Sequence, residues 1–229
     1  MPVLLHATVE SRAGRREVEI PVRELVLAGW TGRDKAAVEH HIRELEALGV
    51  KPPATTPIYY RVSAARATTD TVIEVPGEDS SGEVEFVVVN AGGELLLGAG
   101  SDHTDRKAET FGITLSKQLC DKPVATTFWP LAEVSGHWDD LVLRAHIVSG
   151  GRRELYQEGT LAKMLPLDAL IRGHAPDGRL AEGCLFFGGT FAAIGGIRPA
   201  DRFEGELVDP RLGRRIAFGY DIRTLPVRG

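Results

Sequence analysis

A succession of short apolar segments after Pro57 constrains the fold more than any other feature of this chain. The segments "IYYRV", "TVIEV", "EVEFVVV" and "ELLLGAG" are separated by Gly, Pro, Ser and Asp, and two longer stretches follow, "DLVLRAHIVSGGRRELYQEG" and "RFEGELVDPRLGRRIAFGYDI". Such segments are typical of β-strands and hairpins. We also expect a short helix at "PLDALIRG", closed by Gly173, and a Gly-rich buried strand at "GCLFFGGTFAAIGG". The sequence therefore predicts an α+β, β-rich fold with few short helices.

The first 57 residues have a different pattern. The alternating runs "LLHATVES" and "REVEIPV" around "RAGR" predict a β-hairpin. The stretch "DKAAVEHHIRELEALG" predicts a helix that Asp34 can cap and Gly49 can end, and the prolines of "KPPATTP" then predict a loop. We expect residues 1–57 to form a separate layer or lid on a β-domain of residues 58–229, or to be continuous with it.

Composition narrows the class of protein. A hydrophobic content of 43% and a charged content of 26% are ordinary for a soluble globular chain. The formal charge of −5 and the absence of basic runs argue against a nucleic-acid surface. No apolar segment reaches the roughly 20 residues of a membrane helix, and the N-terminus lacks a signal-peptide pattern. Cys120 and Cys184 have no metal-type spacing, so we expect two buried free thiols in a reducing cytoplasm, with one disulfide as the alternative.

Three carboxylates stand at the ends of two expected strands. Glu83 and Glu85 are two residues apart at the start of "EVEFVVV", so their side chains point to the same side of the strand, with Cα atoms roughly 6.6–7 Å apart. Their spacing alone favours an exposed strand face. Asp102 follows the next strand, however, and if the two strands pair it joins the two glutamates at one end of the sheet. An all-oxygen triad suits Mg²⁺, Mn²⁺ or Ca²⁺.

Six short motifs occur in the order found in the fumarylacetoacetate hydrolase superfamily, which the chain resembles over most of its length. They are "HIRE" with "KPPATTPIYYRV", then "GEVEF", "SDHTDR", "KPVATTFWP", "YQEGTLAKML" and "FFGGTFAAIGG". The motifs "AGWTGRD", "GSDHTDR" and "SKQLCDKP" are similar to those of an uncharacterised bacterial branch. The resemblance implies a mixed β-sandwich or roll, a homodimer and a divalent metal ion, Mg²⁺ or alternatively Mn²⁺ or Ca²⁺.

The resemblance also implies roles for individual residues. Glu83, Glu85 and Asp102 would hold the metal ion. Arg106 and Thr190 would bind the substrate, and for Arg106 a salt bridge to Glu109 or Asp105 is the alternative.

Three residues would be catalytic by the same resemblance. Lys122 is the expected lysine, with Lys117 as a competing assignment. His41 and Glu44 would form a dyad that activates water or moves a proton. Equally, His41 is in phase with the apolar side of its helix, and His40 with Glu44 is an alternative dyad.

The resemblance further implies a metal-dependent hydrolase that cleaves a C–C bond in a small carboxylate, a 2-oxo acid or acylpyruvate. A decarboxylase or keto-enol isomerase of the same superfamily, or a non-catalytic member that binds metal or carboxylate, are the alternatives. Departures from the family pattern include a shortened interval between Glu85 and Asp102, Ser101 in place of asparagine, and Phe191 in place of proline.

Overall fold

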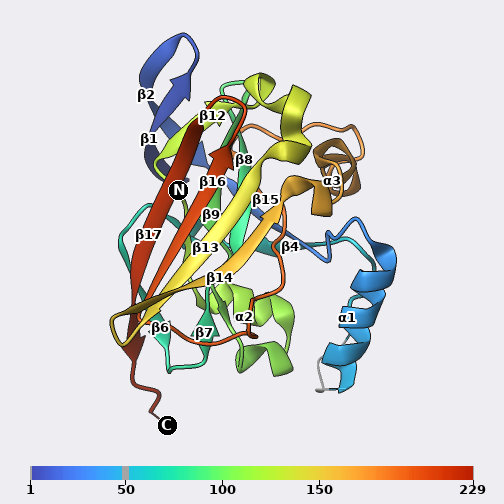
Figure 1. Cartoon of the computed structure of the whole chain (residues 1–229), viewed down its shortest axis with the longest axis vertical. Coiled ribbons are helices and arrows are strands. Elements are labelled where there is room, and N and C mark those ends of the chain that lie inside the picture. The colour runs from blue at the N-terminus through green and yellow to red at the C-terminus, as the bar shows by residue number, and fades with distance from the viewer. Residues whose placement is uncertain (1, 48–51, 229) are drawn as a thin grey trace.

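Two β-sheets packed face to face form the body of the protein in the computed structural model, which describes residues 2–47 and 52–228 (Figure 1). Within that part, the side chains of residues 41, 44, 45 and 47 are not described. The larger sheet has eight strands, in the order β2 (Gly14–Val22), β1 (Val3–Ser11), β12 (Thr127–Pro130), β9 (Glu94–Ser101), β8 (Val84–Ala91), β15 (Cys184–Phe187), β3 (Glu24–Gly29) and β4 (Ile58–Val62).

The smaller sheet has five strands, in the order β14 (Arg152–Thr160), β13 (Val142–Ser149), β16 (Arg202–Asp209), β17 (Arg214–Leu225) and β6 (Val72–Pro76). Two short ribbons join β10 (Thr104–Asp105) to β7 (Ser80–Ser81), and β11 (Lys122–Pro123) to β5 (Ala67–Thr68). The α-helices are α1 (Lys35–Ala47), α2 (Ile113–Leu119) and α3 (Leu167–His174). The short 3₁₀ segments are η1 (Ala64–Arg66), η2 (Ala108–Thr110), η3 (Leu131–Glu133), η4 (Ser135–Asp140) and η5 (Leu161–Lys163).

The apolar run of β8 is buried on both faces of its sheet. Because side chains alternate along a strand, Phe86 and Val88 pack into the core between the two sheets, with Phe203 of β16. Val87 and Val89 face a second cluster, whose members come almost entirely from the eight-stranded sheet itself. That sheet therefore curls around its own core, and β8 is central to both hydrophobic clusters.

A tight hairpin joins β8 to β9. Ala91 pairs with Glu94, which leaves Gly92 and Gly93 as a two-residue turn with φ of 67° and 85°. A two-residue turn with positive φ at both positions matches the twist of antiparallel strands, and glycine adopts it without steric cost. The pairing runs back to Val84 opposite Ser101. The beginning of β8 and the end of β9 therefore meet at one edge of the sheet.

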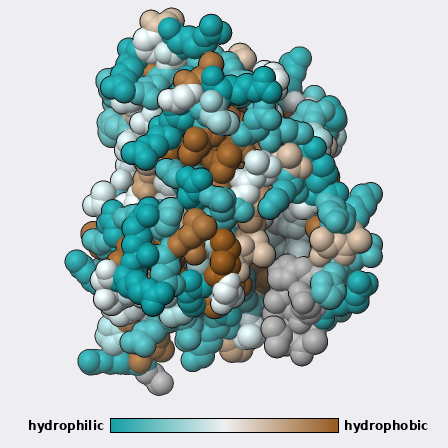
Figure 2. All heavy atoms as spheres, in the orientation of Figure 1, coloured by the Kyte–Doolittle hydropathy of each residue, from teal (hydrophilic) through white to brown (hydrophobic). Residues whose placement is uncertain are grey.

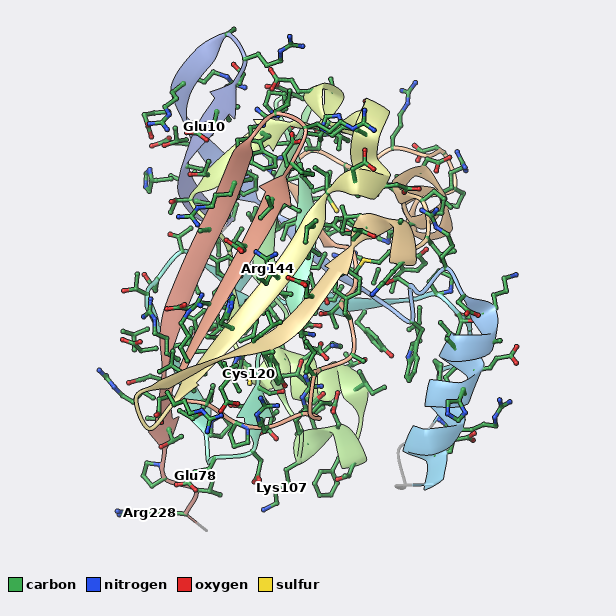
Figure 3. All side chains as sticks on the ribbon, viewed as in Figure 1. Glu10, Glu78, Lys107, Cys120, Arg144 and Arg228 are labelled. Carbon is green, nitrogen blue, oxygen red and sulfur yellow. The ribbon has the colours of Figure 1, made fainter. Side chains whose placement is uncertain are left out.

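The outer face of the five-stranded sheet is polar. Arg144 projects from β13 (Figure 3), where it forms ion pairs with Glu158 of β14 and Glu206 of β16. Figure 2 shows this side of the molecule as largely hydrophilic, with small hydrophobic areas near its centre. The alternating pattern of β13 thus follows from a solvated face opposite a buried one. Of the described helices, none has the length and apolar character needed to cross a membrane.

The N-terminal segment contributes β1, β2 and β3 to the same sheet as β8 and β9. The predicted hairpin and helix are confirmed, and the amide groups of Ala36 and Ala37 donate to Asp34 Oδ1 at the start of α1, while the predicted end at Gly49 lies outside the described residues. Figure 1 shows α1 standing to one side of the sheets. The division into layers of residues 1–57 and 58–229 stays a prediction.

Other details of the sequence reading need correction. The helix α2 was not predicted, α3 continues past Gly173 to His174, and β15 ends at Phe187, so the Gly-rich residues after it form a loop. The α+β, β-rich architecture with few short helices is confirmed, as are two buried free thiols at Cys120 and Cys184.

Candidate metal centre

Glu83, Glu85 and Asp102 converge at the edge where β8 begins and β9 ends. Glu83 directly precedes β8 and Glu85 lies within it, so both side chains project to one side of the strand. Asp102 follows β9, and its amide donates to the Glu83 carbonyl at 3.0 Å, which extends the strand pairing by one step. One carboxylate oxygen from each of the three residues lies within 4.8 Å of the others.

Glu85 is the least compensated of the three carboxylates. Its side chain is buried, and its Oε2 accepts a hydrogen bond from the Gly189 amide at 2.7 Å. Among the described residues it forms no ion pair with a basic side chain. Burial, together with the negative charges of Asp102 and Glu83, raises the pKa of Glu85 well above its ordinary value.

Gly189 places its amide against Glu85 because no other residue fits there. Its φ is +99°, and a Cβ at this position would stand 1.9 Å from Thr31 Oγ1. The glycine therefore allows the loop after β15 to approach β8 closely and to donate to the buried carboxylate.

Glu83 is paired with two basic side chains. Arg106 Nη2 lies 2.9 Å from Glu83 Oε1, and Lys117 Nζ lies 3.6 Å from Oε2. Burial alone would raise the pKa of Glu83, but the charges of Arg106 and Lys117 outweigh it and hold that pKa at about 2. Arg106 also donates to Ser81 Oγ and pairs with Glu109, so its salt bridge to Glu109 coexists with its contact to the site.

Lys117 and Lys122, the two lysines that the sequence left open, occupy different environments. Lys117 lies on α2, in the segment between Lys107 and Cys120, which are the two residues that Figure 3 labels there. Its ammonium is directed at Asp102, and its Nζ lies 5.8 Å from the Tyr60 ring centroid. Burial opposes its charge, yet the carboxylates of Asp102 and Glu83 raise the pKa of Lys117.

Lys122 is fully buried and holds backbone together. Its Nζ donates to the carbonyls of His103 at 2.7 Å, Cys120 at 2.9 Å and Lys117, and lies 3.5 Å from Asp102 Oδ1. All three hydrogen atoms of the ammonium thus have backbone acceptors. The structure therefore directs Lys117 at the three carboxylates and places Lys122 behind them.

A buried polar chain supports this edge of the sheet from behind. His103 bonds through Nε2 to Ser80 Oγ and through Nδ1 to the Tyr220 hydroxyl, both at 2.9 Å, and Tyr220 bonds to Ser101 Oγ at 2.8 Å. Ser101 Oγ in turn accepts the Glu83 amide at 3.2 Å. Burial, with the charges of Lys122 and Arg106, lowers the pKa of His103 to about 3, so the imidazole is neutral.

Thr190 lies beside the carboxylates with its hydroxyl already engaged. It donates to the Val84 carbonyl at 2.7 Å and accepts from Gln157 Nε2 at 2.8 Å, while Gln157 Oε1 accepts the Val84 amide at 3.0 Å. The hydroxyl hydrogen is therefore used on backbone and not directed at a substrate carboxylate. Gln157, the glutamine of the motif "YQEGTLAKML", links β14 to the start of β8, a role that the sequence analysis did not assign to it.

The expected dyad is not brought to the carboxylates by any described contact. His41 and Glu44 lie on α1, and their side chains are outside the described residues. His40, the alternative, is exposed.

The donor set of this edge fits a divalent cation. Three carboxylates supply only oxygen ligands, which suits Mg²⁺ or Ca²⁺. Glu85 has one amide as its hydrogen-bond partner and, among the described residues, no basic side chain at ion-pair distance, so a cation at the triad would stabilise its ionised form. The cluster is thus able to hold a metal ion.

Comparison with known proteins agrees with this fold. Residues 28–220 match the family described as "Protein of unknown function (DUF2848)". No curated protein matches the sequence. The structure is similar to that of Cg1458, with a TM-score of 0.66 at 13% identity over 97% of this chain and 100% of that one.

Two further similar structures are enzymes in complex with a metal ion. A 2-keto-3-deoxy-D-arabinonate dehydratase complexed with magnesium and 2,5-dioxopentanoate has a TM-score of 0.63 at 17% identity, over 93% of this chain and 78% of that one. A 4-oxalocrotonate decarboxylase from Pseudomonas putida G7, complexed with calcium and acetate, has a TM-score of 0.54 at 15% identity, over 87% and 76%. The fold is that of fumarylacetoacetate-hydrolase-like proteins, which confirms the architecture that the resemblance implied.

Proposed function

The chain belongs to the DUF2848 family, and on that premise we propose that it is a divalent-metal-dependent enzyme of the fumarylacetoacetate hydrolase superfamily that acts on a 2-oxo carboxylate. One observation carries the proposal. Glu85 is a buried carboxylate that forms no ion pair among the described residues, and it lies beside Glu83 and Asp102 at ligand distance.

Glu83, Glu85 and Asp102 would hold the ion. When bound, a divalent cation supplies a Lewis acid that polarises the adjacent oxygens of a 2-oxo carboxylate. Lys117 is the proposed proton carrier at this site, because its ammonium is directed at Asp102 and α2 holds it there. Arg106 positions Glu83 by direct ion pairing and adds positive charge near an anionic substrate.

Two of the similar structures support this choice of substrate and metal. One is a complex with magnesium and 2,5-dioxopentanoate, and the other is a complex with calcium and acetate, of enzymes named as a dehydratase and a decarboxylase. Both names describe enzymes of keto or oxo acids. These names support a proposed action next to a 2-oxo group.

Among the possible reactions, the described residues favour decarboxylation, in which the bond to the departing CO₂ breaks and the enolate carbon next to the oxo group then takes up a proton. This reaction needs a cation for the oxo acid and a proton carrier, roles that the triad and Lys117 can fill. Hydrolysis of a C–C bond, which the resemblance implied, needs in addition a base for water. The sequence offers His41 with Glu44, or His40, for that role, so hydrolysis is the second candidate.

The test measures Mg²⁺ binding and turnover on the same protein. We expect Mg²⁺ to raise the Tm of the wild-type chain and to support proton exchange or decarboxylation of oxaloacetate above the rate with Mg²⁺ alone. Glu85→Gln should lose both effects. Lys117→Met should keep Mg²⁺ binding and lose exchange. Glu94→Gln, at the exposed far end of the same hairpin, is the matched control and should behave as wild type.

Each alternative gives a different result. Stabilisation by Mg²⁺ without exchange or turnover would support the non-catalytic binding reading. Cleavage of an acylpyruvate that is lost in His41→Ala, while proton exchange remains, would establish hydrolysis. Unchanged Mg²⁺ binding by Glu85→Gln would refute the site itself. The homodimer and the cytoplasmic location stay predictions.

A further inference from the structure

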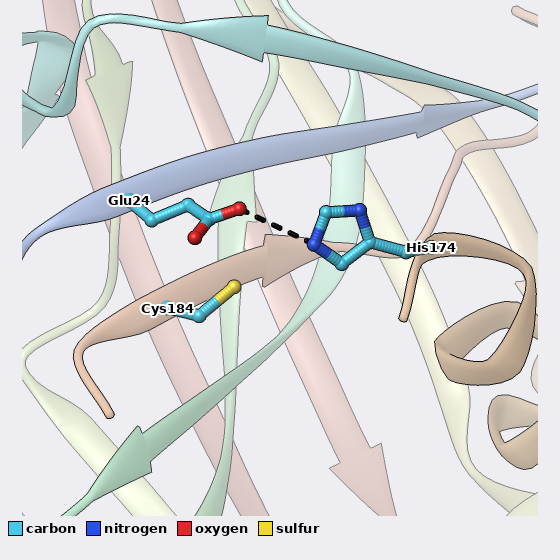
Figure 4. Close-up of side chains that lie close together, drawn as sticks. All are labelled: Glu24, His174 and Cys184. Atoms are coloured by element: carbon cyan, nitrogen blue, oxygen red, sulfur yellow. Dashed lines mark ion pairs between the residues drawn. The ribbon is translucent and has the colours of Figure 1, made fainter. Parts of the chain in front are cut away.

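A second group of metal-type ligands lies near the other end of the central strands. Glu24 of β3 and Cys184 of β15 are partners in a parallel pairing, so their side chains project from the same face of the sheet. His174, the last residue of α3, lies over them (Figure 4). A carboxylate oxygen, an imidazole nitrogen and the thiol sulfur lie within 4.8 Å of one another.

The group is closed on one side and open on the other. Cys184 is fully buried, whereas the side chains of Glu24 and His174 keep 21% and 18% of their surface exposed. An ion can therefore enter from the carboxylate and imidazole side and reach the sulfur without unfolding of the core.

This group is separate from the three carboxylates. Cys184 precedes Gly189, the glycine that donates to Glu85, by five residues, which corresponds to roughly 17 Å of extended chain. The donor sets also differ, because one is composed of oxygen alone and the other combines sulfur, nitrogen and oxygen.

We propose that Glu24, His174 and Cys184 form a second metal site, which takes a thiophilic divalent ion such as Zn²⁺. Zinc is bound in proteins by thiolate, imidazole and carboxylate in one tetrahedral set, and three protein ligands leave a fourth position for water or another donor. Glu24 Oε1 and His174 Nε2 are 3.3 Å apart, as expected for two ligands that a single ion can join with small side-chain rotations.

Neighbouring residues already hold two of these ligands in place. Arg61 Nη1 pairs with Glu24 Oε1 at 2.8 Å and would stay as the outer partner of the carboxylate. The His174 ring packs against the rings of Tyr59 and Phe186, at centroid distances of 5.7 and 6.0 Å. On binding, the Cys184 sulfur loses its proton to the buffer and forms the bond to the ion, with no change of oxidation state.

The chain offers a matched control for the thiol, because Cys120 and Cys184 are its only cysteines and both are buried. The full chain is treated with chelator, supplied with excess Mg²⁺ to fill the triad, and titrated with Co²⁺ as a spectroscopic substitute for Zn²⁺. We expect a thiolate-to-cobalt charge-transfer band in the near ultraviolet that saturates at about one equivalent in the wild type and in Cys120→Ser.

The band should vanish in Cys184→Ser, and His174→Gln should bind Co²⁺ at least about tenfold more weakly. Zn²⁺ should remove the band and raise the Tm in the wild type. If Cys184→Ser does not fold, the Co²⁺ affinity of His174→Gln decides the test, because His174 is partly exposed and lies on the open side of the group. A band that persists in Cys184→Ser, or Co²⁺ binding that excess Mg²⁺ abolishes, would overturn the proposal while leaving the carboxylate site intact.

Discussion

The substitution Glu85→Gln tests whether ionisation of the buried Glu85 carboxylate lowers the free energy of unfolding of the metal-free protein. Its pKa is raised well above the ordinary value of 4.5, so from about pH 4.5 up to the raised pKa the folded state binds one proton more than the unfolded state. The free energy of unfolding must then fall as the pH rises through this window, by about 1.4 kcal/mol per pH unit from this group. Glutamine has the same shape and can accept the Gly189 amide, but it does not titrate.

The expected result is a difference of slopes. In chelator, the stability of Glu85→Gln relative to wild type should increase with pH above about pH 4.5, by at most about 1.4 kcal/mol per pH unit. Glu83 does not disturb the comparison, because its pKa is held at about 2 and its own contribution is lost only in acid below about pH 4.5. Saturating Mg²⁺ should abolish the difference in slope, since the ion binds the ionised carboxylate of the wild type.

Urea unfolding followed by the fluorescence of the three tryptophans measures both slopes. The comparison between the two proteins cancels every other titrating group that the substitution leaves alone. Parallel stability curves in chelator would show that Glu85 ionises without penalty in the folded protein. The reasoning from burial and like charge, and with it the case for a cation at this edge, would then be wrong.

Two further predictions separate residues that look alike in the sequence. Lys117→Met should tighten Mg²⁺ binding, measured by calorimetry, because a positive charge that competes with the ion leaves the site. Lys122→Met should instead lower the free energy of unfolding by about 3–5 kcal/mol, because the buried backbone carbonyls that Lys122 bonds lose their donor. Gly189→Ala should destabilise the protein by about 1–3 kcal/mol more than Gly196→Ala, measured as the urea midpoint, since both glycines have positive φ but only the first would clash, with Thr31 Oγ1. An equal loss of stability in the two lysine variants, or in the two glycine variants, would contradict the assigned roles.

Local patterns in the sequence predicted much of the fold. The alternation of β1, β2, β13, β16 and β17 reflects sheets with one buried face, and the cap at Asp34 is a local hydrogen bond that the residue types themselves encode. The helix α2 escaped prediction because it is only seven residues long and has a buried serine and lysine. Its stability comes from tertiary contacts, which local propensity does not contain.

The carboxylate triad followed from strand pairing, because residues two apart share a face and antiparallel neighbours end together. Strand pairing could not decide between Lys117 and Lys122, because that choice depends on which ammonium the fold surrounds with backbone carbonyls. Likewise, Glu24, His174 and Cys184 are too far apart in the sequence for any spacing rule to join them. Register between β3 and β15, and the position of α3, bring them together.

The Gly92–Gly93 turn has a consequence for how this site can evolve and be engineered. Seven residue steps of paired strand, roughly 24 Å, separate the turn from the carboxylates, and the pairing is fixed from the carboxylate end. Residues added or removed at the turn therefore change the length of the hairpin without changing which face Glu83 and Glu85 occupy. The short interval between Glu85 and Asp102 is thus a continuous hairpin, and its turn, far from the carboxylates, is a suitable point to insert a tag or a reporter domain.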